Sequence, residues 1–296
     1  MASLVITVPY GATFVPGPIS RRLGLTDGRD LGREHWYLTD PIILNLAAKM
    51  LYRGQDKPPR PFVPFRFSPL VIDPLGLLSS ELSGSQPNGP NFLSNFTTGA
   101  KFPVYSEDER QIIINQAVKP YFEQLEAACS NELANNNLVA LITLRSFATV
   151  PQPHERDRRL PRPQVSLGSN SQHSPEGLVT LAGTIFRALG LWPQLNWPLI
   201  SADPPGPLAA QVRLKTLSLG LRRDLYMDEK TGKLKDTAEG LVRVLSIFFD
   251  LLEQELDRVA NIRLRRAFPP KKPSNIIKSD DPPMTNKVKK PYMKVR

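Results

Sequence analysis

The chain is poor in the residues that build metal sites and disulfide frameworks. Its 296 residues include one cysteine, Cys129, and three histidines, His35, His154 and His173. A single thiol excludes an intrachain disulfide and any zinc site made of several cysteines. No histidine has a second one three or four positions away, so we interpret all three as structural or surface residues.

Long apolar runs and targeting signals are also missing. No stretch reaches the roughly 18 apolar residues that a transmembrane helix needs. Met1 leads directly into the apolar run of residues 3–8, without a charged segment before a long apolar one and without an Arg-rich amphipathic presequence. We therefore expect a cytoplasmic location, with cytoskeletal, ciliary and mitochondrial sites left open.

Net charge is nearly absent from most of the chain and concentrated at its end. Of 38 Lys and Arg residues, 11 lie within residues 263–296 beside two acidic residues, which places +9 of the formal net charge of +10 there. Residues 263–296 also contain six prolines and few large apolar side chains. Such a segment cannot bury enough surface to offset its ordering entropy. We predict a folded domain over residues 1–262 and a basic tail over residues 263–296 that is disordered unless bound.

Apolar runs and capping residues divide the first 262 residues into strands and helices. Short β-branched runs are typical of buried strands in a parallel sheet. Asp40 before Pro41 is a strong helix start, because Asp accepts from free amides and Pro fits the first helical position. Ser106 and Glu109 form a capping box, and Pro120 is expected to kink the helix that follows. The predicted strands are 3–8, 65–73 and 138–144, the predicted helices begin near Asp40, Ser106, Ser174 and Asp236, and residues 55–64, 76–104 and 152–173 are predicted loops.

Five short motifs accompany these elements in a fixed order. They are Pro9-Tyr10-Gly11-Ala12, Arg66 to Asp73, Lys119-Pro120-Tyr121-Phe122, Arg145-Ser146-Phe147 and Leu225-Tyr226-Met227-Asp228-Glu229. In this order they resemble the motifs of the N-formylglutamate amidohydrolase family, over roughly residues 3–255. The resemblance implies an α/β fold of the zinc-carboxypeptidase-like (phosphorylase/hydrolase-like) type, with a mixed sheet flanked by helices. It also implies metal-assisted hydrolysis of an N-acyl amino acid.

The positions to which the resemblance assigns chemistry carry other residues in this chain. The family motifs imply metal-binding histidines at Tyr10 and Arg145, a further histidine at Phe122 and a Glu at Gly220. A phenol with a pKa near 10 is a poor zinc ligand at neutral pH, and a guanidinium repels the ion. The Asn-Arg pair that the resemblance implies for the substrate carboxylate falls on Leu75 and Gly76, which removes a bidentate cation.

Two carboxylates remain at positions that match the family motifs, Asp40 and Asp73. The resemblance allows Asp40 to be a metal-site carboxylate, although its role as a helix cap alone explains the residue. Arg145 is expected to pair with Asp73 or Asp40 in the vacated pocket.

From the substitutions we predict a pseudoenzyme without catalytic, metal or cofactor-binding residues. Tyr10, Asp40, Asp73, Phe122, Arg145 and Gly220 would be vestigial positions of a former active site. The tail is predicted to dock the body on a large acidic assembly, either a cytoskeletal or axonemal microtubule or a ribonucleoprotein such as a ribosome, and not on a membrane. Its predicted contact residues are Arg263, Arg265, Arg266, Lys271, Lys272, Lys278, Lys287, Lys289, Lys290, Lys294 and Arg296.

The alternative is a divergent metal-dependent hydrolase that acts on N-acyl amino acids. Asp40, Asp73 and Asp224 would then form a rebuilt site of oxygen ligands only, which suits Mg²⁺ or Mn²⁺ better than Zn²⁺.

Overall fold

The apolar runs of the sequence form the centre of a single sheet. The computed structural model describes residues 1–24, 28–52, 58–75, 101, 104–151, 159–170, 172–199, 204 and 208–267. Within these residues six strands pair in the order β2-β1-β3-β6-β4-β5. The strands are β1 (Ala2–Val8), β2 (Phe62–Pro64), β3 (Leu138–Phe147), β4 (Val165–Gly168), β5 (Pro193–Leu195) and β6 (Leu214–Arg222).

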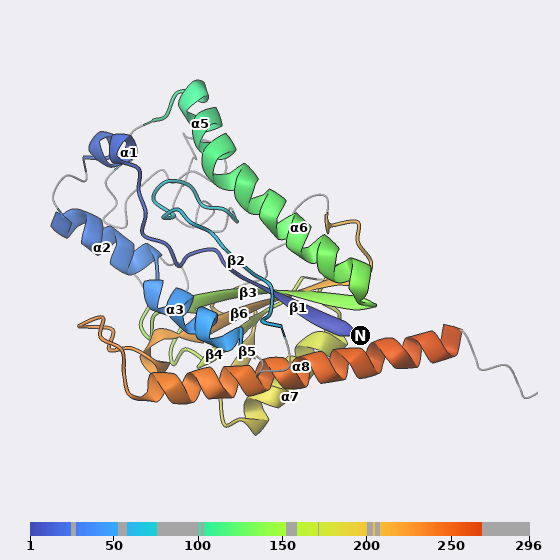
Figure 1. Ribbon diagram of the computed structural model, residues 1–296. Coiled ribbons are helices and arrows are strands. Elements are labelled where there is room, and N and C mark those ends of the chain that lie inside the picture. The colour runs from blue at the N-terminus through green and yellow to red at the C-terminus, as the bar shows by residue number, and fades with distance from the viewer. Residues whose placement is uncertain are drawn as a thin grey trace, which may run out of the picture.

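The sheet is mixed and has helices on both sides. Strands β2, β1, β3 and β6 run parallel, whereas β4 is antiparallel to β6 and parallel to β5. Helices α5 and α6 cover one side, and α3, α7 and the long α8 cover the other (Figure 1). The predicted mixed sheet flanked by helices is confirmed. The helices are α1 (Gly17–Arg22), α2 (Gly28–Leu38), α3 (Pro41–Met50), α5 (Glu107–Ile113), α6 (Lys119–Asn135), α7 (Glu176–Ala188) and α8 (Thr237–Ala267).

Local capping residues begin α3 and α5 where the sequence predicts, whereas α7 begins after Pro175 without a side-chain cap. Asp40 caps α3, and its Oδ1 accepts a hydrogen bond from the backbone N–H of Ile43 at 3.0 Å. At α5, Ser106 and Glu109 exchange the two hydrogen bonds of a capping box. These interactions satisfy amides that lack a partner in the first helical turn, so each helix start depends on sequence close by.

A π-helical segment joins α5 to α6. It spans Ile114–Val118 and ends directly before Lys119 and Pro120. Pro120 has no N–H to donate to the carbonyl of Gln116, so the regular ladder of hydrogen bonds is interrupted at this point. The disturbance that we predicted at Pro120 thus takes the form of a widened turn on its N-terminal side.

The predicted strand over residues 65–73 is wrong. The strand in this region is β2, which pairs with β1 through Phe62, Val63 and Pro64. Residues after it form turns, because Ser68 accepts from Leu70 with its side chain and from Val71 with its carbonyl. Pro69 lacks an N–H for a strand ladder, which favours this turn over a strand. The apolar side chains of Leu70, Val71 and Ile72 are buried all the same.

Strand β4 also corrects a prediction, since it lies within residues 152–173, which we predicted to be loop. Its four residues are too few to show a period, and their burial depends on pairing with β6.

Helix α8 is fixed to the body by a buried guanidinium. Arg60 donates to Glu253 and Asp250 of α8 and to the carbonyl of Met50. The helix runs through Ala267 and so includes the backbone of Arg263, Arg265 and Arg266. The other predicted contact residues of the tail, from Lys271 to Arg296, lie outside the described residues, and the domain boundary stays a prediction. None of the helices described here is long and apolar enough to span a membrane.

Candidate functional site

Hydroxyl side chains line one side of the sheet near the carboxyl ends of its parallel strands. Thr7 of β1 is paired with Thr143 of β3, which is paired in turn with Ser218 of β6. One step further along, Arg145 of β3 lies opposite Gly220 of β6. Because side chains alternate along a strand, these residues point to the side covered by α6. We call this the polar face.

The opposite side, the apolar face, carries only apolar side chains from the central parts of the same strands. It packs against α3, α7 and α8, and its residues include Leu4, Ile6, Val8, Ile142, Leu144, Leu217, Leu219 and Leu221.

Tyr10 and Asp73 meet at the edge of the polar face. The hydroxyl of Tyr10, just beyond β1, donates to Oδ1 of Asp73 at 2.9 Å. The same oxygen accepts from the backbone N–H of Leu75 at 2.9 Å. Burial and the negative charge of Asp73 raise the pKa of Tyr10 well above its usual value, so the phenol keeps its proton.

Arg145 places a buried positive charge next to this pair. Its Nε and Nη2 donate to Ser218 Oγ at 3.1 and 2.7 Å, and its side chain is almost fully buried. Because Thr7 of β1 lies opposite Thr143 of β3, Tyr10 and Arg145 both follow this pair at the ends of neighbouring strands, and the charge of Arg145 opposes the rise in the pKa of Tyr10. A carboxylate, a phenol and a guanidinium therefore converge where the parallel strands end.

Tyr121 links helix α6 to the polar face. Thr7 Oγ1 donates to the carbonyl of Val63 at 2.6 Å, and the Tyr121 hydroxyl completes this chain with a 2.7 Å hydrogen bond to Thr7. The next residue, Phe122, packs its ring on Tyr121 with 5.2 Å between centroids. The position at which the resemblance implies a histidine is therefore an apolar packing residue of α6.

The surroundings of Gly220 leave no room for the glutamate that the resemblance implies there. A Cβ atom at this position would lie 2.7 Å from Cδ1 of Leu199, 3.2 Å from Cβ of Ser166 and 3.3 Å from Cδ1 of Phe147. Leu199 is held in place because Ser166 Oγ donates to its carbonyl and accepts from its N–H. A side chain of any size at this point requires its neighbours to move.

Asp40 is fully engaged by structural contacts. Besides capping α3, it accepts from the Tyr226 hydroxyl, and its Oδ2 lies 3.8 Å from Nε of Arg223. Arg223 also donates to the carbonyls of Trp36 and Thr39 at the end of α2. A cavity of about 220 Å³ lies beside Asp40 and Arg223. Within the described chain, this arrangement explains Asp40 as a cap and an ion-pair partner.

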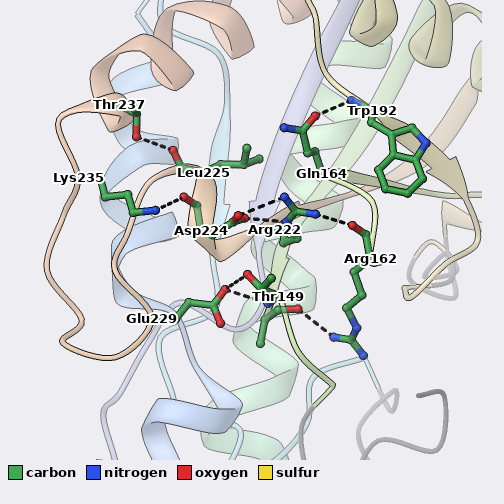
Figure 2. A network of polar contacts seen from close by, with 11 residues as sticks. Thr149, Arg162, Gln164, Trp192, Arg222, Asp224, Leu225, Glu229, Lys235 and Thr237 are labelled. Carbon is green, nitrogen blue, oxygen red and sulfur yellow. Dashed lines mark hydrogen bonds and ion pairs between the residues drawn. The ribbon is translucent and has the colours of Figure 1, made fainter. Parts of the chain in front are cut away.

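The last motif, Leu225 to Glu229, fastens the turn after β6 to neighbouring loops. Arg222 pairs with Asp224 at 2.7 Å and donates to the carbonyl of Arg162, and Lys235 donates to the carbonyl of Asp224 (Figure 2). Glu229 accepts from both the N–H and the hydroxyl of Thr149 (Figure 2). These contacts give the motif a structural role.

The side chains present do not fit a metal ion. Over the part of the chain that the structure describes, no three His, Cys, Asp or Glu side chains gather as ligands. Asp40, Asp73 and Asp224 each belong to a different hydrogen-bonded group, with Tyr226, Tyr10 and Arg222 respectively. Neither a zinc site nor the predicted all-oxygen site is formed by these residues.

Sequence reasoning missed the hydroxyl row and Tyr121. We interpreted residues 138–144 as a buried strand without separating its two faces. The signal was present as a period of two, with Thr143 and Arg145 in β3 and Thr216, Ser218 and Gly220 in β6. Apolar residues on the alternate positions made the strands look continuous.

Comparison with known proteins identifies a family for this chain. The family model for N-formylglutamate amidohydrolase matches residues 2–227. A crystal structure of N-formylglutamate amidohydrolase from Ralstonia eutropha JMP134 is 22% identical, with a TM-score of 0.63 over 89% of this chain and 94% of that chain. A protein from Agrobacterium tumefaciens is 15% identical, with a TM-score of 0.63 over 86% of this chain and 91% of that one. No curated protein matches the chain in sequence.

These matches correct the prediction of a non-catalytic structural protein docked to a microtubule or ribosome. The family match and the Ralstonia structure point to a hydrolase, so that prediction is wrong. The residues at Tyr10, Arg145 and Gly220 misled us, because we took the absence of the family's metal ligands to mean that the chain is not a hydrolase. The predicted contact role of the basic tail is not tested by these findings.

Proposed function

Because this chain belongs to the N-formylglutamate amidohydrolase family, we propose that it hydrolyses the amide bond of a small N-acyl amino acid. The observation that carries the proposal is the convergence of Asp73, Tyr10 and Arg145 at the carboxyl edge of the parallel strands. In open α/β sheets, ligands bind at this edge.

Amide hydrolysis needs a base for the attacking water and a positive or donor group for the developing oxyanion. Asp73 is the base: a water that attacks the carbonyl carbon gives its proton to this carboxylate. The C–N bond then breaks, and the proton passes to the departing amine. The products are a carboxylic acid and a free amino acid.

Arg145 supplies the fixed charge for the oxyanion. Its position is set by Ser218, which accepts from two guanidinium nitrogens. Since the side chain is buried, its charge acts through a medium of low dielectric and needs little reorganisation. Tyr10 keeps its proton and orients Asp73 through their hydrogen bond.

The test is release of free amino acid from N-formyl-L-glutamate and from a panel of N-formyl and N-acetyl amino acids. Asp73→Asn keeps an oxygen that accepts from Tyr10 and Leu75 but removes the base. We expect it to lower kcat by about 10²- to 10⁴-fold. Asp224→Asn is the matched control, because Asp224 pairs with Arg222 away from Tyr10 and Arg145, and it should leave kcat unchanged.

Chelation sharpens the same test. Since the side chains of the site do not form a metal-ligand set, exhaustive dialysis against a chelator should leave the rate unchanged. Absence of hydrolysis across the whole panel contradicts the proposed function. Hydrolysis that Asp73→Asn leaves intact contradicts the assigned base.

A further inference from the structure

A cavity of about 330 Å³ opens beside the polar face, between β2, α6 and the loop after β1. Aromatic rings from Phe14, Phe67 and Tyr121 form much of its wall, and Arg66, Gln116 and Gln124 supply polar groups. Its size and its mostly apolar lining with a few polar groups match those of small-molecule sites.

The aromatic part of the wall is preformed. The rings of Phe14 and Phe67 contact each other with centroids 5.5 Å apart and planes inclined by 52°. Phe14 is 58% exposed, which leaves a large apolar surface in water at the cavity. A planar apolar group placed there gains burial and a favourable ring contact.

Arg66 gives the cavity a positive charge. Its guanidinium is exposed at the cavity, and it has no hydrogen bond or ion pair with any other residue of the described chain. A guanidinium offers a planar fork of donors that matches a carboxylate in two-point contact. The side-chain amides of Gln116 and Gln124 add donors and acceptors nearby.

Tyr121 connects this cavity to the polar face. It lines the cavity, and its hydroxyl contacts Thr7 on the polar face. Burial raises the pKa of Tyr121, and the charge of Asp73 contributes to this rise. The π-helical segment contributes Gln116 and Ala117 to the same wall, and such widened turns are frequent at functional sites.

We propose that this cavity selects an N-acyl aromatic amino acid, whose carboxylate binds Arg66 and whose ring packs on Phe14 and Phe67. This inference rests on the proposed function, because it names the substrate class of that reaction. The single guanidinium of Arg66 can pair with the single carboxylate of such a substrate. The second carboxylate of an acylated glutamate would be placed against phenyl rings without a partner, which is unfavourable.

Isothermal titration of the full chain tests the site without depending on turnover. The probes are N-acetyl-L-phenylalanine, N-acetyl-L-phenylalaninamide, which lacks the carboxylate, and N-formyl-L-glutamate. We expect the first to bind tightest. Arg66→Ala should weaken it by about two- to fivefold, as for a solvent-exposed ion pair, and leave the amide unchanged. Phe14→Ala should weaken both aromatic probes.

Arg243→Ala on α8 is the matched control, since Arg243 is also exposed and lies far from this cavity in sequence and on the other side of the sheet. It should change none of the affinities. Equal binding of the acid and the amide, binding that Arg66→Ala leaves intact, tighter binding of N-formyl-L-glutamate, or no binding of any probe overturns the inference.

A parallel hydrolysis assay separates this inference from the proposed function. Binding of N-acetyl-L-phenylalanine that depends on Arg66, without release of phenylalanine or any other amino acid, supports the site and contradicts the proposed reaction. Release of amino acids with a KM that Arg66→Ala does not change supports the reaction and overturns the site.

Discussion

The two faces of the central sheet are built from the same strands and differ in the chemistry of the side chains that they carry. The apolar face presents leucine, isoleucine and valine to α3, α7 and α8. The polar face presents a row of hydroxyls and a guanidinium toward α6 at the same depth of burial. Because side chains alternate, each strand serves both faces, and a slip of one residue in pairing would exchange them.

This difference indicates that the apolar face contributes mainly to stability and the polar face mainly to the chemistry of the site. Burying the apolar face stabilises the fold by removing apolar surface from water. Burying Thr7, Ser218 and Arg145 is unfavourable unless each finds a partner, and each does, in Val63, Arg145 and Ser218 respectively. We therefore expect substitutions on the apolar face to change stability and substitutions on the polar face to change activity.

The largest expected effect on stability lies on the apolar side. Phe248 of α8 is fully buried and stacks on Phe186 of α7 with 4.1 Å between ring centroids. Phe248→Ala should lower the free energy of unfolding by about 3–5 kcal/mol. Urea unfolding followed by circular dichroism measures it. A loss below about 1 kcal/mol would mean that this face is not the main source of stability.

The polar face should behave in the opposite way when its cation is removed. Arg145→Met keeps most of the side-chain volume and removes the charge, so we expect kcat to fall by about 10²- to 10³-fold. The free energy of unfolding should change by less than about 2 kcal/mol, because a well-packed apolar replacement of a buried charge is often tolerated. Arg213→Met, at an exposed arginine, is the control. A loss of stability equal to that of Phe248→Ala would break the contrast between the faces.

A smaller loss of stability is expected at Gly220, where neighbouring side chains fill the space on the polar face. Gly220→Ala places a methyl group 2.7 Å from Cδ1 of Leu199 and close to Ser166 and Phe147. Since the end of Leu199 is flexible, we expect a loss of only about 1 kcal/mol, at the low end for overpacking. Thermal unfolding of Gly220→Ala with and without Leu199→Ala measures the coupling. Additive effects of the two changes would show that Leu199 does not fill this space.

Alkali should also lower stability, mainly through tyrosines on the α6 side. Burial raises the pKa of Tyr105 from 10.0 to about 12, and it raises the pKa of Tyr121 and Tyr10 as well. Raised values in the folded state mean that stability is level below pH 10 and falls as pH rises above it, because the unfolded chain ionises first. Tyrosinate absorbance and urea unfolding between about pH 9 and pH 11 measure this. Ionisation of all tyrosines near pH 10 without unfolding contradicts it.

Strong local signals predicted the elements that form the framework. The strands β1 and β3 and the starts of α3 and α5 follow from apolar runs and capping residues within a few positions. We predicted a strand at residues 65–73 and not at β2 because Leu70, Val71 and Ile72 are apolar. These residues are buried, but they do not pair as a strand. Strand β4 was missed because its four residues depend on β6 for their pairing.

By itself, the sequence determined the family, the strands β1 and β3, the starts of α3 and α5, and the absence of histidine at Tyr10 and Arg145, since motifs, caps and residue identities are local properties. Only the tertiary structure decided that Tyr10 donates to Asp73, that Arg145 binds Ser218, and that Leu199 fills the space at Gly220. These pairs are 63, 73 and 21 positions apart in the chain. The pairing of strands distant in sequence brings them together, and no pattern within a single strand records which residues its neighbours will place beside it.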